Sequence, residues 1–310
     1  MKKNISILYP KSEFTSNQLQ KLSFAGQVSF VDSKSESSLK DLIKLSKDAD
    51  ILAFSPDKIG KNASEWLSEI LEKAPNVKGL ALNTVHADYV NAEYCKERGI
   101  RVFTVSDYKI EAVAEHVLLL LLGSAKRLFI NDRRTYRRRY LPELGFEIIG
   151  RRLGVIGSDQ TAARVVQRAK ELGMAVYATE RFDGAYIAPQ GGIFGNSDFL
   201  TLHLPNTEEN KKFLNKERIS ILKDKAIVIN LSGREIVDEN EMRKALLSGH
   251  VSQYLFEGNS LHKSPLEDVE TAIMFKEFSG NTFESRRRRG DSWVINISNL
   301  AGKSSSYRSL

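Results

Sequence analysis

The sequence is poor in cysteine and in long apolar runs. Cys95 is its one cysteine in 310 residues, so no disulfide can form within the chain. The run "VLLLLLG" at residues 117–123 is far too short to cross a bilayer, and the N-terminal "MKKNISILYPKSEF" lacks the apolar stretch of a signal peptide. We therefore predict a cytoplasmic protein with no membrane segment and no redox chemistry at sulfur.

The composition is that of a globular protein long enough for two domains. Hydrophobic residues make up 41% of the chain and charged residues 27%. The formal net charge is +7, with arginine concentrated in "RRTYRRRY" at 133–140 and "SRRRRGDSW" at 285–293. Such clusters can bind phosphate backbones, but we favour solvated helix faces and subunit interfaces as their explanation. Nucleic acid is therefore not a predicted partner.

Short apolar runs alternate with amphipathic stretches along the chain, a pattern typical of parallel strands joined by helices. The first hundred residues hold one such series, and a second series begins at Leu153. Between them, "YKIEAVAEHVLLLLLGSAKRLF" at 108–129 predicts one long helix with enough apolar residues for burial at an interface. The pattern predicts an α/β protein made of two doubly wound parallel-sheet domains.

The second series opens with "LGVIGSDQTAARVV", in which glycine ends a strand and leads into a helix. This is where a phosphate can approach backbone amides. The chain also resembles the D-isomer-specific 2-hydroxyacid dehydrogenases from about Val77 to about Thr282. The segments that carry the resemblance include "EAVAEHVLLLLLGSAKR", "GRRLGVIG", "SDFLTLHLPNTEEN", "AIVINLSGREIVDENEMRKALLSGHV" and "SPLEDVETAIMFKEFSGNT".

The resemblance implies a flavodoxin-like substrate domain at residues 1–101 and a Rossmann nucleotide-binding domain with a dimerisation helix and arm at 102–282. A C-terminal helix within 283–310 returns to the first domain, and the active cleft lies between the domains. The resemblance also implies a homodimer joined through the long helix and the arginine-rich arm, an NAD or NADP cofactor and no metal.

The phosphate loop departs from the family pattern G-x-G-x-x-G. The corresponding positions are Gly157, Asp159 and Ala162, and the second glycine normally lets the pyrophosphate approach the backbone. A carboxylate there costs about 3 kcal/mol, about a hundredfold in affinity, at a separation of about 5 Å and an effective dielectric of about 20. We therefore expect weak NAD or NADP binding at a loop that also contains Ser158, Gln160 and Thr161.

The adenosine side of the implied site is better preserved. Glu180 stands where the family's acidic residue accepts the ribose hydroxyls, and "HLPNT" matches the segment that walls the adenine. A solvated strand end and a turn-forming proline are the alternative explanation. Adenosine or AMP is expected to bind comparably to the dinucleotide. The remaining predicted cofactor residues are Leu204, Pro205, Thr207, Leu231 and Ser232.

The family's catalytic positions are altered. Gly233 stands where the family has its substrate-binding arginine, with Arg234 one residue later, and Glu277 stands where it has its acid–base histidine. A carboxylate is a poor substitute, because ketone reduction needs a proton donor that is also positively charged. Three further candidates take no firm role: Glu257, which falls on a structural aspartate of the family, His262, which lies nearest the position of the histidine's partner, and His86 in the amide loop of the substrate domain.

These changes favour a catalytically impaired relative, a pseudoenzyme that senses a small-molecule or adenine-nucleotide ligand or binds a protein partner. One alternative is an active NAD(P)-dependent oxidoreductase for a small 2-hydroxy or 2-keto acid, in which Arg234, His86 and Glu277 replace the missing groups. A further alternative, based on the arginine clusters alone, is a nucleic-acid-associated binding protein, which a steep salt dependence of binding would reveal.

Overall fold

The computed structural model describes residues 2–31 and 38–303, which divide into two compact units. One unit combines the described residues of Met1–Tyr108 and of Phe283–Leu310, and the other is Lys109–Thr282. The boundary predicted after residue 101 lies inside strand β5 (Arg101–Thr104), which pairs with its neighbour in the first unit. The pairing of this strand extends the first unit beyond the predicted boundary.

The first unit is built on a five-stranded parallel sheet in the order β2-β1-β3-β4-β5, which is the flavodoxin-like order. Its other strands are β1 (Lys3–Pro10), β2 (Gly26–Val31), β3 (Ile51–Phe54) and β4 (Gly79–Leu82). Its helices are α1 (Ser16–Ala25), α2 (Leu39–Ser46), α3 (Ala63–Lys73), α4 (Ala92–Glu97) and α11 (Phe283–Leu300).

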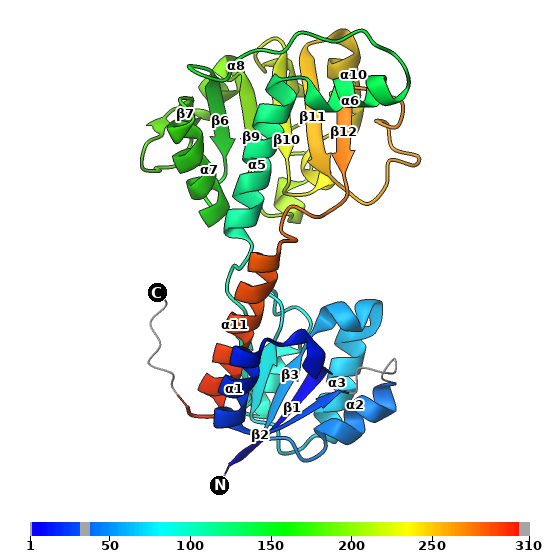
Figure 1. Ribbon diagram of the computed structural model, residues 1–310, viewed down its shortest axis with the longest axis vertical. Helices are drawn as coiled ribbons and strands as arrows, with labels where there is room; N and C mark the ends of the chain where they lie inside the picture. The colour runs from blue at the N-terminus through cyan, green and yellow to red at the C-terminus, as the bar shows by residue number, and fades with distance from the viewer. Residues whose placement is uncertain (1, 32–37, 304–310) are drawn as a thin grey trace. The chain divides into compact units, whose positions relative to one another are not determined.

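The C-terminal helix α11 packs beside α1 in the first unit (Figure 1). Trp293 is buried in this contact, where its ring stacks on Phe14 at a centroid distance of 5.7 Å. Its indole N–H donates to the carbonyl oxygen of Ala81 at 2.9 Å. The described part of the C-terminal segment is therefore part of this unit's core, and residues 304–310 lie outside the described residues.

The second unit is built on a seven-stranded parallel sheet in the order β12-β11-β10-β9-β6-β7-β8, which is the Rossmann order with one strand added at an edge. Its strands are β6 (Arg152–Ile156), β7 (Ala175–Ala178), β8 (Tyr186–Ile187), β9 (Phe199–Leu202), β10 (Ala226–Asn230), β11 (Val251–Glu257) and β12 (Ala272–Phe275). Its helices are α5 (Ile110–Ala125), α6 (Leu128–Tyr136), α7 (Gln160–Glu171), α8 (Gln190–Asn196), α9 (Lys216–Ser220) and α10 (Glu239–Ser248). The two sheets confirm the predicted fold class.

The long helix predicted at 108–129 is two helices. Helix α5 ends at Ala125, and α6 begins after Arg127, whose φ of +55° lies in the left-handed region and ends the α-helical geometry. In Figure 1, α5 and α7 cover the same face of the sheet, and their apolar side chains form one buried layer with it. Most of the apolar excess of α5 is therefore buried within its own unit.

The strands of the second unit are parallel, so their carboxyl ends share one edge of the sheet. In doubly wound folds, ligands bind in the loops along this edge. Except for His86, the predicted site residues lie at this edge, in the loops after the strands, in the first turn of α7 (Gln160 and Thr161) or at the last residue of β11 (Glu257). Within the two described ranges, no helix is long and apolar enough to span a membrane.

Candidate functional site

The turn after β6 has the shape of a nucleotide-binding loop. Gly157 has a φ of +117°, and a Cβ at this position would lie 2.0 Å from the carbonyl oxygen of His203. Only glycine fits here, because both the backbone conformation and the close approach of β9 exclude a side chain. The first glycine of the family pattern therefore keeps its structural role.

Asp159 is the N-cap of helix α7. Its carboxylate accepts a hydrogen bond from the backbone N–H of Ala162 at 2.6 Å, and its side chain is 54% exposed. The predicted neighbours Ser158 and Gln160 are exposed, and Thr161 is half-buried. In a Rossmann site the pyrophosphate binds at this helix N-terminus. Here the Asp159 carboxylate accepts one of the backbone N–H groups at this helix N-terminus.

His203 does not offset this negative charge. Its Nδ1 lies 3.9 Å from the Asp159 carboxylate, and its Nε2 lies 3.0 Å from the hydroxyl of Thr201. Burial lowers the pKa of His203 below its ordinary value, and the nearby Asp159 only partly opposes this shift. The imidazole is therefore neutral near pH 7 and places no positive charge beside Asp159.

Glu180 lies beside this loop, as the ribose position requires. Strand β7 pairs directly with β6, with Ala178 opposite Val155, and Glu180 follows β7 as an exposed residue. Glu180 and the turn at Gly157 therefore follow two adjacent, paired strands at the same edge of the sheet. Arg181, also exposed, comes next along the chain.

Ser232 links the ends of β9 and β10. Its hydroxyl donates to the carbonyl oxygen of Leu202 at 2.8 Å and accepts from the backbone N–H of Leu204 at 3.1 Å. Leu231 is half-buried and packs against the core layer beneath α5 and α7. The two hydrogen bonds of Ser232 hold the carboxyl ends of β9 and β10 together.

Pro205 and Thr207 form a local turn after β9. The side-chain amide of Asn210 donates to the carbonyl oxygen of Pro205 at 2.9 Å and to the hydroxyl of Thr207 at 3.3 Å. Both residues thus stabilise the predicted adenine-wall segment.

The backbone at Gly233 disfavours the arginine side chain that the family has at this position. Its φ is +140°, and a Cβ there would lie 2.9 Å from Cγ of Asn206. The Asn206 amide donates to the Glu235 carboxylate at 3.1 Å, and the Gly233 carbonyl accepts from Asn230 at 2.7 Å. The position is therefore shaped for glycine, with a carboxylate nearby.

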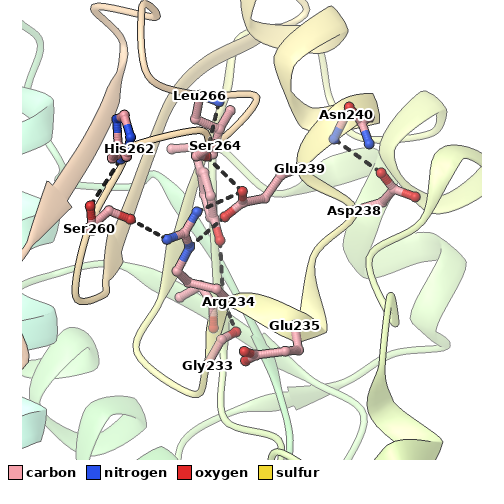
Figure 2. Close-up of polar contacts among 12 residues, drawn as sticks. Gly233, Arg234, Glu235, Asp238, Glu239, Asn240, Ser260, His262, Ser264 and Leu266 are labelled. Atoms are coloured by element: carbon pink, nitrogen blue, oxygen red, sulfur yellow. Dashed lines mark hydrogen bonds and ion pairs between the residues drawn. The ribbon is translucent and has the colours of Figure 1, made fainter.

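Arg234 is bound within the second unit (Figure 2). Its guanidinium donates to both carboxylate oxygens of Glu239, at 2.7 and 2.8 Å, and to the carbonyl oxygen of Ser260. The hydroxyl of Ser264 also donates to Glu239, at 2.8 Å. This bidentate ion pair joins the turn after β10 to helix α10 and to the loop after β11, so Arg234 acts as a clamp between them.

The carboxylates after β11 and β12 are also engaged. Glu257 accepts from the backbone N–H groups of Phe278 and Ser279, at 2.8 and 2.7 Å, and from the hydroxyl of Ser279 at 2.9 Å. Glu277, at the family histidine position, is exposed and accepts from the Asn259 amide at 3.2 Å. Glu257 therefore shapes the loop that carries Glu277.

The two candidate histidines lie in different units. His262 is 74% exposed on the loop after β11, with its Nδ1 3.7 Å from Glu267. His86 is exposed in the first unit, and its backbone N–H donates to the Thr84 hydroxyl at 3.3 Å. Among the described residues, no group of three His, Cys, Asp or Glu side chains could hold a metal ion.

His116 on α5 was not among the sequence candidates. It is buried, and its ring meets those of Phe278 and Phe275 at centroid distances of 5.0 and 5.9 Å. Burial lowers its pKa, and Glu257 partly opposes this, so the imidazole is neutral near pH 7. The segment "VAEH" places this histidine inside an apolar helix, which was the available signal.

A family model and a curated relative both match this chain. Residues 118–274 match the family described as D-isomer specific 2-hydroxyacid dehydrogenase, NAD binding domain. The chain is 26% identical to a glyoxylate reductase of Pyrococcus furiosus over 249 residues, 74% of each protein.

Two solved structures share the fold. A D-lactate dehydrogenase from Aquifex aeolicus complexed with NAD and lactic acid superposes with a TM-score of 0.71 at 21% identity, covering 97% of this chain and 96% of that one. An acyclic imino acid reductase in complex with NADPH and D-Arg gives a TM-score of 0.75 at 22% identity, covering 97% and 98%.

The Arg234 clamp predicts an energetic coupling between Arg234 and Glu239. Arg234→Met should lower the free energy of unfolding by about 2 kcal/mol, because it leaves a largely buried carboxylate unpaired. In a double-mutant cycle with Glu239→Leu, measured by urea denaturation, the two losses should be non-additive by about 1–2 kcal/mol. The Glu241–Lys244 pair on the same helix, whose lysine is 71% exposed, is the control, with an expected coupling below about 0.5 kcal/mol. Additive losses at Arg234 and Glu239 would contradict the clamp.

Proposed function

The chain belongs to the D-isomer-specific 2-hydroxyacid dehydrogenase family, and from this membership we propose that it is a pseudoenzyme whose nucleotide-binding unit senses a small ligand or serves a protein partner. The observation that carries the proposal is the bidentate pairing of Arg234 with Glu239. An arginine bound in this way is a poor anchor for a substrate carboxylate, and Gly233 has no side chain to offer.

Loss of a proton donor supports the same proposal. Glu277 occupies the histidine position, and a carboxylate cannot supply the positive charge that an imidazolium places beside a developing negative charge. Glu257 is occupied by three hydrogen bonds from Phe278 and Ser279. Neither residue replaces an imidazolium.

We propose that NAD or NADP is at most a weak ligand. Gly157 and Glu180 suit the adenosine half, whereas Asp159 places a negative charge at the pyrophosphate position. Adenosine should then bind about as tightly as the dinucleotide, since the phosphates add no favourable contact at α7.

The arginine clusters favour internal roles over nucleic-acid binding. Arg134 binds Glu270 and Glu143, at 2.7 and 2.8 Å, while Arg289 pairs with Asp57 within the first unit. Guanidinium groups paired in this way are less available to a phosphate backbone.

We predict no measurable reduction of glyoxylate, pyruvate or hydroxypyruvate with NADH or NADPH. Loss of the carboxylate anchor and loss of the proton donor each lower the rate by about two to four orders of magnitude. The measurement is absorbance of the reduced cofactor at high enzyme concentration, with an active family member as the positive control.

Robust turnover by the unmodified protein would contradict the pseudoenzyme proposal and favour an active oxidoreductase. Loss of that turnover in His86→Ala, with retention in the loop control His262→Ala, would then identify His86 as a relocated proton donor. Restoration by Asp159→Gly, Gly233→Arg and Glu277→His together is expected to be incomplete, because the +140° φ of Gly233 disfavours a side chain.

We also propose a homodimer formed through α5 and the arm that follows it. Leu119 and Leu122 on α5 are 51% and 40% exposed, and Leu128, Leu141 and Leu144 are more so. A second copy could cover this apolar surface.

Light scattering should show a particle of twice the 34.9 kDa chain mass at micromolar concentration. Leu119→Glu should shift it toward the monomer, because a charge would be buried at the interface. Leu247→Glu, at a leucine on α10 that is 65% exposed, should not. A clean monomer for the unmodified protein would refute this interface.

A further inference from the structure

We propose that the nucleotide edge of the second unit binds an adenosine derivative whose 5′ substituent is a cation, such as an ammonium or sulfonium group. This inference rests on the function proposed above, because it names the ligand class of the same site. It uses two features of that site, the carboxylate after β7 and the carboxylate that caps α7.

The carboxylate after β7 suits the ribose. In Rossmann sites an acidic side chain after the second strand binds the ribose hydroxyls, and the 5′ side of the nucleoside faces the glycine turn after the first strand. Glu180 is exposed after β7, and β7 pairs with β6 in the register that places Ala178 opposite Val155. A nucleoside held by Glu180 therefore directs its 5′ group toward the turn at Gly157 and Asp159.

The carboxylate at the turn determines what that 5′ group can be. Asp159 uses one oxygen to cap α7 through the N–H of Ala162, yet its side chain is 54% exposed and open to a ligand. A 5′ phosphate would meet this like charge where it normally meets free backbone N–H groups. A 5′ cation would instead form a favourable ion pair with the carboxylate.

Neighbouring basic groups do not reverse this preference. His203, which faces Asp159, is buried and neutral near pH 7. Arg164 on α7 is held by Glu111 at 2.6 Å. Arg181 follows Glu180 and so belongs to the ribose end of the site. The charge that meets the 5′ group is therefore that of Asp159.

Calorimetric titration of the full-length protein with three probes tests the inference. The probes are 5′-amino-5′-deoxyadenosine, which is protonated at neutral pH, adenosine, which is neutral, and AMP, which is anionic. We expect the amine to bind about tenfold more tightly than adenosine and AMP about tenfold more weakly, a charge effect reduced from its buried value because Asp159 is half-exposed.

Asp159→Asn is the decisive variant, because asparagine also caps helices and so retains the hydrogen bond from Ala162 while removing the charge. The three affinities should then converge to within about threefold. Asp224→Asn, an exposed aspartate that precedes β10 at the opposite edge of the sheet, should leave the order of affinities unchanged.

The inference is overturned if AMP binds as tightly as the amine, if Asp159→Asn preserves the preference for the amine, or if no probe binds up to about millimolar concentration. These results are distinct from a failure of the pseudoenzyme proposal, which is read from keto-acid turnover. A protein that reduced glyoxylate and still preferred the amine would leave the present inference standing.

Discussion

The hydrogen bond by which a carboxylate caps helix α7 is the interaction on which the ligand preference proposed for the second unit depends. The backbone N–H of Ala162 donates to Asp159 at 2.6 Å, at the point where a dinucleotide would place its pyrophosphate. The turn that brings Asp159 there depends on Gly157, which lies too close to the His203 carbonyl for any side chain. The chain thus retains the shape of a dinucleotide loop, and we propose that this loop accepts a positive charge in place of a negative one. Because His203 is neutral, it does not offset the negative charge of Asp159.

Other polar side chains along this edge of the sheet are also bound to groups of the protein itself. Arg234 binds Glu239 and the Ser260 carbonyl, and Glu257 binds the backbone of the loop that carries Glu277. The polar side chains of Arg234 and Glu257 thus hold loops in place at this edge. The apolar layers on both faces of the sheet are continuous, so these differences are confined to the ligand edge and do not reflect a weakened fold. This distribution favours a binding role over a rearranged catalytic one.

Much of the fold could be predicted from the sequence, because buried parallel strands appear as apolar runs such as "LGVIG" and "AIVINLS". Strand β8 has only two residues, both exposed, so it gave no such signal. The break at Arg127 also escaped prediction, since arginine rarely adopts a left-handed conformation. At the site, the altered positions were evident, but their contacts were not. Arg234 meets Ser260 across 26 residues of sequence, a contact that only the fold creates.

Calorimetric titration with NADH tests the central claim most directly, because it asks whether the α7 terminus still accepts a pyrophosphate. The account predicts a dissociation constant weaker than about 100 μM for the unmodified protein, and a tightening of at least about tenfold in Asp159→Gly, since glycine is also a tolerated N-cap. Low-micromolar affinity that is unchanged by Asp159→Gly would show that the carboxylate does not control nucleotide binding, and would contradict the account.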